Sequence, residues 1–211
     1  MKALNIILES FLTEEEGHNS LLLLDIDDTL VTADNIYIYK KSSDGEEEAL
    51  APQEFAEEDT KKEKEKGYSY DFREFKDPDK VANSIKTGLP LISNLKIMDN
   101  YIQNGWTIGV LTARGMEDVI ASTMKEWLKY RDAEGNLKSA KRKLARNLVF
   151  AVSDDNSRQY SKPTSFERKA EVIKDLAEKY DRVYLLDDDV SNIEAVNNLG
   201  IKNVKAMKAK K

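Results

Sequence analysis

The chain of 211 residues contains no cysteine and a single histidine, His18. The absence of cysteine excludes disulfide bonds, thiolate catalysis and cysteine-ligated zinc sites, and one imidazole cannot build a histidine metal cluster. A metal site in this chain therefore has to use oxygen ligands, chiefly carboxylates, and such a site favours Mg²⁺.

Long apolar runs are also absent. No stretch approaches the roughly 20 residues that a membrane span needs, and no positively charged leader precedes an apolar segment with a cleavage site. We therefore expect a soluble, cytoplasmic protein with no membrane partner. The hydrophobic content of 40% suffices for one domain with a modest insertion. The net charge of −6 argues against broad nucleic-acid binding, although a nucleic-acid end stays possible as a substrate.

Two carboxylates, Asp25 and Asp27, directly follow the apolar run Leu21–Leu24. Parallel α/β sheets place their chemistry at the carboxyl ends of buried strands, and a carboxylate buried there needs a cation or a proton nearby. The alternative is structural, because Asp28 and Thr29 are residue types that also start loops and cap helices. The pattern predicts a metal-assisted site.

A second strand-like segment, Trp106–Leu111, ends in Thr112, Ala113, Arg114 and Gly115 before a helical pattern begins near Met116. A hydroxyl, a guanidinium and a turn at a helix start suit a phosphate group, because helix N-termini favour anions and arginine binds phosphate bidentately. The alternative is that Thr112 merely caps the helix.

A third segment, Val183–Leu186, precedes three adjacent carboxylates, Asp187, Asp188 and Asp189, and then Asn192. Three carboxylates at a strand end repel one another unless a cation holds them, whereas the acidic first turn of a helix is the alternative interpretation. Lys169 lies on the amphipathic stretch 165–180, where a lysine is ordinarily a solvated charge.

Taken together, the ordered motifs Asp25-x-Asp27-x-Thr29, strand-Thr112, Lys169 and Asp187-Asp188-x-x-x-Asn192 resemble the four motifs of the haloacid dehalogenase (HAD) superfamily of phosphotransferases, over residues 20–207. Thr112-Ala113-Arg114 and the acidic turn look most like the phosphatase domain of polynucleotide kinase-phosphatases. The resemblance implies an α/β fold with a Rossmann-like parallel sheet, in which the Asp25 strand lies between the strands that end at Thr112 and Leu186.

The chemistry of the residues then assigns roles. Asp25 is the expected nucleophile and forms an aspartyl-phosphate, while Asp27 is the expected acid and base. Lys162 competes with Lys169 for the third motif, and we prefer Lys169 because it lies one turn into a helix and keeps the family's spacing. The remaining expected roles are Mg²⁺ ligation by Asp25 and by Asp188, with or without Asp187, substrate binding by Thr112, Ala113, Arg114 and Lys169, and orientation of the acidic turn by Asn192. The resemblance to the family implies that the backbone carbonyl of Asp27 supplies a further oxygen to the metal.

Three segments organise the chain. Residues 1–19 predict an amphipathic N-terminal helix or arm, whose apolar stripe packs on the domain or, through residues 1–16, binds a protein partner. Residues 20–30 and 89–211 form the predicted core, and residues 31–88 a small β-rich cap. The cap has strands near 36–39 and 68–72, a turn at Asp44-Gly45 and a charged, solvent-facing stretch 57–66. Its aromatic residues either pack the hairpin, which we favour, or stack on a base.

These observations predict a Mg²⁺-dependent phosphomonoester hydrolase whose substrate is a phosphorylated small molecule or a nucleic-acid 3′ end. Two alternatives stay open. A response-regulator receiver would instead be phosphorylated on an acidic residue after the strand 148–152, such as Asp154. A HAD-like structural or assembly component would have little or no catalysis, although the complete motif set argues against it.

Overall fold

The computed structural model describes residues 19–130, 144–153 and 162–210. Its main sheet has five strands in the order β6-β5-β1-β7-β8, and every neighbouring pair is parallel. The strands are β1 (Ser20–Leu24), β5 (Thr107–Thr112), β6 (Leu144–Ala151), β7 (Arg182–Asp187) and β8 (Val204–Lys208). The Asp25 strand was expected to lie between the strands that end at Thr112 and Leu186; this central position is confirmed, and the second of those strands, β7, ends one residue later, at Asp187.

The leucines of β1 explain why this strand is central. Leu21, Leu22, Leu23 and Leu24 are all completely buried. Because successive side chains point to opposite faces of a sheet, Leu21 and Leu23 enter one apolar cluster while Leu22 and Leu24 enter the other. A strand that is apolar at every position is typical of a parallel sheet covered on both faces.

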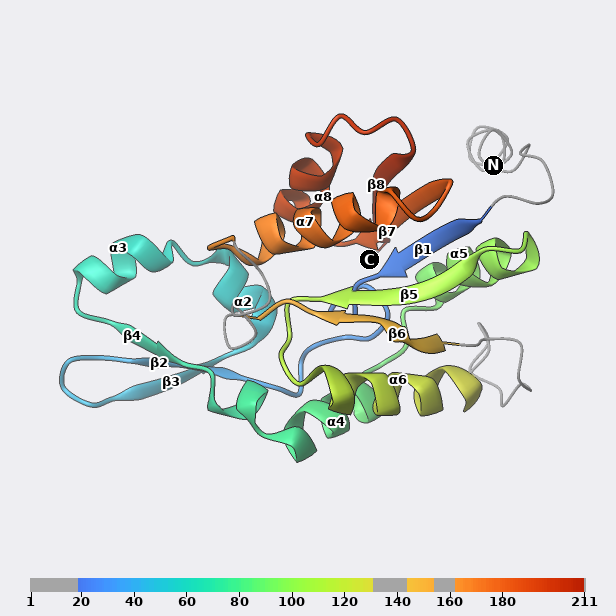
Figure 1. Ribbon diagram of the computed structural model, residues 1–211. Helices are drawn as coiled ribbons and strands as arrows, with labels where there is room; N and C mark the ends of the chain where they lie inside the picture. The colour runs from blue at the N-terminus through green and yellow to red at the C-terminus, as the bar shows by residue number, and fades with distance from the viewer. Residues whose placement is uncertain (1–18, 131–143, 154–161, 211) are drawn as a thin grey trace, which may run out of the picture.

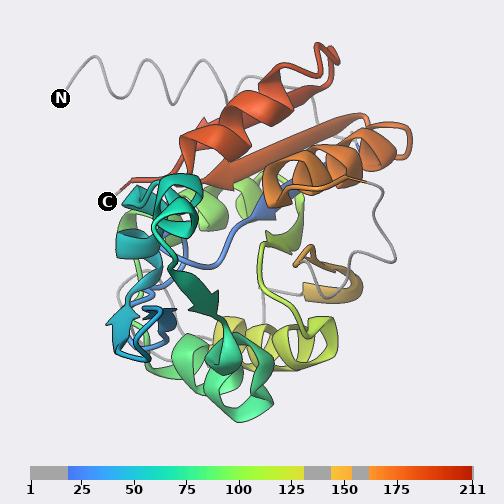
Figure 2. The same cartoon turned by 90° about the vertical axis from the view of Figure 1, so that its left-hand side faces the viewer.

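Helices cover both faces of this sheet (Figures 1 and 2). One face carries α4 (Pro78–Thr87), α5 (Ile92–Gln103) and α6 (Glu117–Tyr130), and the other carries α7 (Ser165–Ala177) and α8 (Val190–Asn197). The predicted α/β class and parallel sheet are confirmed at this level. Among the described residues, no helix has both the length and the apolar character needed to cross a membrane.

Between β1 and α4 the chain forms a second, antiparallel sheet of three strands in the order β3-β2-β4. Its elements are β2 (Ile38–Lys41), β3 (Glu47–Leu50), α2 (Pro52–Glu57), α3 (Thr60–Glu65), β4 (Ser69–Asp71) and the 3₁₀ helix η1 (Arg73–Lys76). Two of the strands and the Asp44-Gly45 turn were expected, and Gly45 adopts φ +88°. The description as β-rich is not confirmed, because helices occupy more of residues 31–88 than strands do. The charged helix α3 has no buried residue.

Aromatic side chains pack within this insertion. The Phe55 ring meets Tyr70 and Phe72 edge to face, at centroid distances of 5.1 and 5.3 Å. The hydroxyl of Tyr39 donates to Glu74. These contacts agree with the interpretation that the aromatic residues hold the small sheet together.

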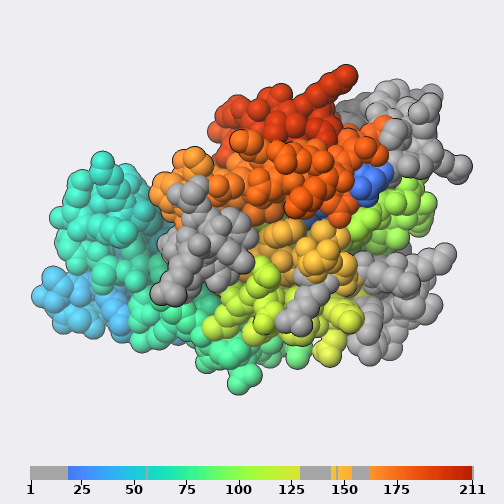
Figure 3. Space-filling model, in the orientation of Figure 1, coloured from blue at the N-terminus to red at the C-terminus, as the bar shows by residue number. Residues whose placement is uncertain are grey.

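The two ends of the insertion are bonded to each other. The amide of Thr32 donates to the carbonyl of Leu89 at 3.0 Å, and the amide of Leu91 donates to that of Leu30 at 2.9 Å. The last helix of the insertion, α4, belongs to the main core, where Val81 and Ile85 join the cluster that contains Leu22. The remainder extends as a lobe beyond the carboxyl ends of the strands (Figures 1 and 3). The predicted helix 1–16 lies outside the described residues.

Candidate active site

Three carboxylates meet where β1 and β7 end. One oxygen each of Asp25, Asp187 and Asp188 lie within 4.8 Å of one another. The strand register explains the meeting, because Leu24 pairs with Leu186 and the amide of Asp25 donates to the carbonyl of Leu186 at 3.0 Å. Two motifs that are far apart in the sequence thus deliver their acidic residues to one place.

Lys169 lies between two of these carboxylates. Its Nζ donates to Asp25 Oδ1 at 2.9 Å and to Asp187 Oδ2 at 2.8 Å, and its side chain is 1% exposed. Burial alone lowers the pKa of the ammonium, but the neighbouring carboxylates of Asp187 and Asp25 outweigh it and raise the pKa above its usual value. Lys169 is therefore charged, whereas the competing Lys162 is exposed.

Helix α7 is fixed so that Lys169 reaches this position. Thr164 and Glu167 form a capping box at its start, with Thr164 Oγ1 accepting from the Glu167 amide. The next residue, Arg168, is buried and donates from Nε to the carbonyl of Val152 at 2.7 Å, which ties the first turn of α7 to the chain following β6. Arg168 was not predicted to be important from the sequence. The one sequence feature that could have indicated it is its position next to Lys169 in the first turn of the helix.

The acidic turn after β7 is ordered by its own side chains. Asp187 is completely buried, and its Oδ1 accepts from the Asn192 side chain at 2.9 Å and from the Asp189 amide at 3.0 Å. Asp189 caps α8 by accepting from the Ser191 amide. Asn192, which we expected to orient the turn, thus donates a hydrogen bond to its first carboxylate. Asn192 Oδ1 is buried and has no hydrogen-bond partner among the described residues.

The donor set fits a divalent cation. Three carboxylates and one ammonium leave a formal excess of two negative charges. Mg²⁺ binds oxygen at 2.0–2.1 Å, so opposite ligands stand roughly 4 Å apart and small side-chain adjustments bring these oxygens into range. Both oxygens of Asp187 already accept hydrogen bonds, so direct ligation by Asp187 would compete with the bonds from Lys169, Asn192 and the Asp189 amide. Burial raises the pKa of Asp25, Lys169 opposes this rise, and a bound cation would oppose it further.

Asp27 stands apart from this carboxylate cluster. Both of its oxygens accept from Arg114, Oδ2 from Nε at 2.8 Å and Oδ1 from Nη2 at 2.5 Å. The loop that carries Asp27 is tight, because the carbonyl of Ile26 accepts from the amides of Leu30 and Val31, and Asp28 adopts φ +51°. The loop thus directs the two carboxylates of the first motif to different partners.

Thr112 ends β5, beside β1, and is completely buried. Its Oγ1 accepts from the amide of Arg114 at 3.2 Å, so the hydroxyl shapes the turn before α6. Ala113 is exposed, and a Cβ at Gly115 would lie 2.9 Å from the Ser153 hydroxyl, which would have to move. Asp154, the receiver-type alternative, lies outside the described residues.

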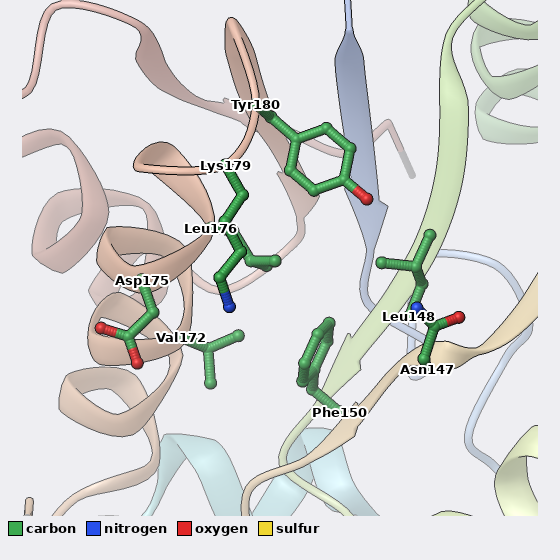
Figure 4. A pocket seen from close by; sticks show the side chains of 8 residues that line it. All are labelled: Asn147, Leu148, Phe150, Val172, Asp175, Leu176, Lys179 and Tyr180. Carbon is green, nitrogen blue, oxygen red and sulfur yellow. The ribbon is translucent and has the colours of Figure 1, made fainter.

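A cavity of about 250 Å³ opens between β6 and α7, where Asp175 and Lys179 are among the residues that line it (Figure 4). Leu148, Phe150, Val172 and Leu176 supply its apolar wall, and none of the carboxylates described above lines it. No protein-family model matches the chain, and no curated protein matches its sequence significantly.

Proposed function

We propose that the protein is a Mg²⁺-dependent phosphomonoester hydrolase of the HAD type that acts through an aspartyl-phosphate on Asp25. The observation that carries the proposal is the buried Lys169, which bridges Asp25 and Asp187 beside Asp188. Burying a lysine between two carboxylates is costly, and a solvated helix face does not require it. A phosphoryl-transfer site gives it a use, because the ammonium offsets the repulsion between the Asp25 carboxylate and an anionic substrate.

The residues supply the steps of such a reaction. A carboxylate oxygen of Asp25 attacks phosphorus, the bond to the ester oxygen breaks, and the departing oxygen takes a proton from Asp27. Water then attacks the phosphorus of the aspartyl-phosphate, its proton passes to Asp27, and the Asp25 carboxylate is released. Mg²⁺ held by Asp25 and Asp188 would offset the negative charge of the phosphoryl group. Lys169 and Thr112 are proposed to hold the phosphoryl oxygens.

The insertion 31–88 is proposed to be a cap that selects the substrate. Its outer part, from β2 to η1, lies beyond the carboxyl ends of the strands (Figure 1), and Asp25, Asp187 and Asp188 meet where β1 and β7 end. Closure of such a lobe excludes water and orders a substrate. Replacing residues 44–66 with a short Gly-Ser link should change the relative rates among phosphomonoesters and keep Mg²⁺-dependent turnover of a small aryl phosphate. Unchanged ratios would favour a docking surface for another protein.

The test of the proposed function is a phosphatase screen with Mg²⁺ over nucleotides, nucleic-acid 3′ phosphates, sugar phosphates and phosphoproteins. Asp25→Asn should abolish turnover and also the acid-stable label that a phosphorylated substrate leaves on the protein. Asp27→Asn should slow turnover by ~10² to 10⁴. Asp175→Asn, an exposed carboxylate on α7, is the matched control. Full activity of Asp25→Asn, or of the wild type in EDTA, would refute this mechanism.

A further inference from the structure

Arg114 is a buried cation near the proposed site that donates several hydrogen bonds. Its guanidinium grips both oxygens of Asp27, and its side chain is 1% exposed while that of Asp27 is 23% exposed. A bidentate arginine–carboxylate pair fixes the orientation of both groups as well as joining their charges. Asp27 is therefore held in one orientation and still open to the solvent side.

Helix α4 holds the other side of the guanidinium. Arg114 Nη1 donates to Ser84 Oγ at 2.7 Å and to the carbonyl of Val81 at 3.4 Å, and Ser84 Oγ itself donates to that carbonyl at 2.9 Å. The ring of Phe75 lies 5.8 Å from the guanidinium carbon. Four of the five N–H groups of the guanidinium are thus committed to Asp27 and α4.

We propose that Arg114 is a positioning residue that acts through Asp27, and not a ligand of the transferring phosphate. The inference rests on the proposed function. A bidentate grip on phosphate would require the guanidinium to give up bonds to Asp27 or to α4, which would leave a buried cation and a carboxylate with fewer partners. With its observed bonds, Arg114 instead fixes the orientation in which the Asp27 carboxylate faces the reacting groups.

The step most sensitive to this positioning is the breakdown of the aspartyl-phosphate. There, Asp27 takes the proton from water while the water oxygen bonds to phosphorus and the bond from phosphorus to Asp25 breaks. The attacking water has no covalent attachment to the protein or the substrate before it reacts. The rate of this step therefore depends most on the orientation of the carboxylate that accepts its proton. A misplaced catalytic group costs on the order of 10²-fold in rate. With an aryl phosphate, whose leaving group needs little protonation, formation of the intermediate should change much less.

The experiment compares Arg114→Lys, Arg114→Gln and Ser84→Ala with the wild type on p-nitrophenyl phosphate. We expect kcat to fall on the order of 10²-fold in Arg114→Gln and less in Arg114→Lys, which keeps one charged donor. In both Arg114 variants we expect kcat/KM to change less than about fivefold and inhibition by inorganic phosphate to stay unchanged. We also expect a burst of p-nitrophenol close to one per enzyme, and aspartyl-phosphate should accumulate in acid-quenched samples. Ser84→Ala, which removes only a hydroxyl, should show the same pattern more weakly.

Coupling to Asp27 is measured with the double variant. In an Asp27→Asn background, Arg114→Lys should cause little further loss, because a residue that acts through Asp27 has nothing left to position. Arg182→Lys, at the amino end of β7, is the control for an arginine away from the site. Equal losses in both backgrounds, or weaker inhibition by phosphate without a burst, would identify Arg114 as a phosphate ligand and overturn the inference. Absence of Mg²⁺-dependent turnover in the wild type would instead overturn the proposed function, and this inference with it.

Discussion

Replacing Lys169 with methionine tests the centre of the site independently of any substrate. Methionine keeps most of the side-chain volume but removes the ammonium from between Asp25 and Asp187, whose side chains are 8% and 0% exposed. Breaking a buried ion pair from one side costs about 3–5 kcal/mol, because the remaining charge has no partner. For a domain of this size each kcal/mol corresponds to about 2–4 °C in Tm, so we expect a fall of about 6–20 °C.

The assay is urea unfolding in EDTA, followed by the fluorescence of the two tryptophans, Trp106 and Trp127. The control Lys162→Ala should change the free energy of unfolding by no more than about 0.5 kcal/mol, since Lys162 is exposed. Asp187→Asn combined with Lys169→Met should recover part of the loss by removing one of the unpaired charges. A loss below about 1 kcal/mol in Lys169→Met, or no recovery in the double variant, would refute the buried bridge.

Three further perturbations probe the surroundings of the site. Adding Mg²⁺ at 100 times its Kd should stabilise the wild type by about 2.7 kcal/mol, and Asp188→Asn should remove most of that gain in a thermal melt; an equal gain in both proteins would place the ion elsewhere. Thr164→Ala should cost about 1 kcal/mol by removing the cap that accepts from Glu167, and an unchanged urea midpoint would contradict this. Gly109→Ala should cost about 1–3 kcal/mol, because its Cβ would lie 2.7 Å from the Leu23 side chain; unfolding at the wild-type urea concentration would disprove the crowding.

The parallel core could be predicted because its strands are short apolar runs separated by amphipathic helices. Four consecutive buried leucines leave few other folds open, and the carboxyl-end rule then places Asp25 and Asp187 at the same edge. The ion pairs of Lys169 with Asp25 and Asp187 could not be predicted from such local patterns. A lysine in an amphipathic helix is ordinarily solvated, so only its place in the order of motifs pointed to the site.

The structure of the insertion was less predictable because it depends on side-chain contacts between strands, which the spacing of apolar residues in the sequence does not reveal. Strand β3 contains two glutamates, and ion pairs with Lys41 and Arg73 hold Glu47 in the small sheet. Helix α4 was overlooked, although Asp77 followed by Pro78 is a recognisable helix start and Asp77 does cap it. Because α4 was not predicted, the contact between Ser84 and Arg114 could not be anticipated either.

The paired ends of the insertion have a consequence for how this protein tolerates change. Backbone hydrogen bonds between residues 30–32 and 89–91 join the start and the end of the insertion, so the core contacts the same two short segments whatever lies beyond them. The entropy of closing a loop grows only slowly with its length, and these hydrogen bonds have already brought the loop ends together. The outer lobe can therefore be lengthened, shortened or exchanged for one of different shape at little cost to the core. Paired ends of this kind allow the parallel sheet to carry outer lobes of different sequence, provided that α4 is kept with the core.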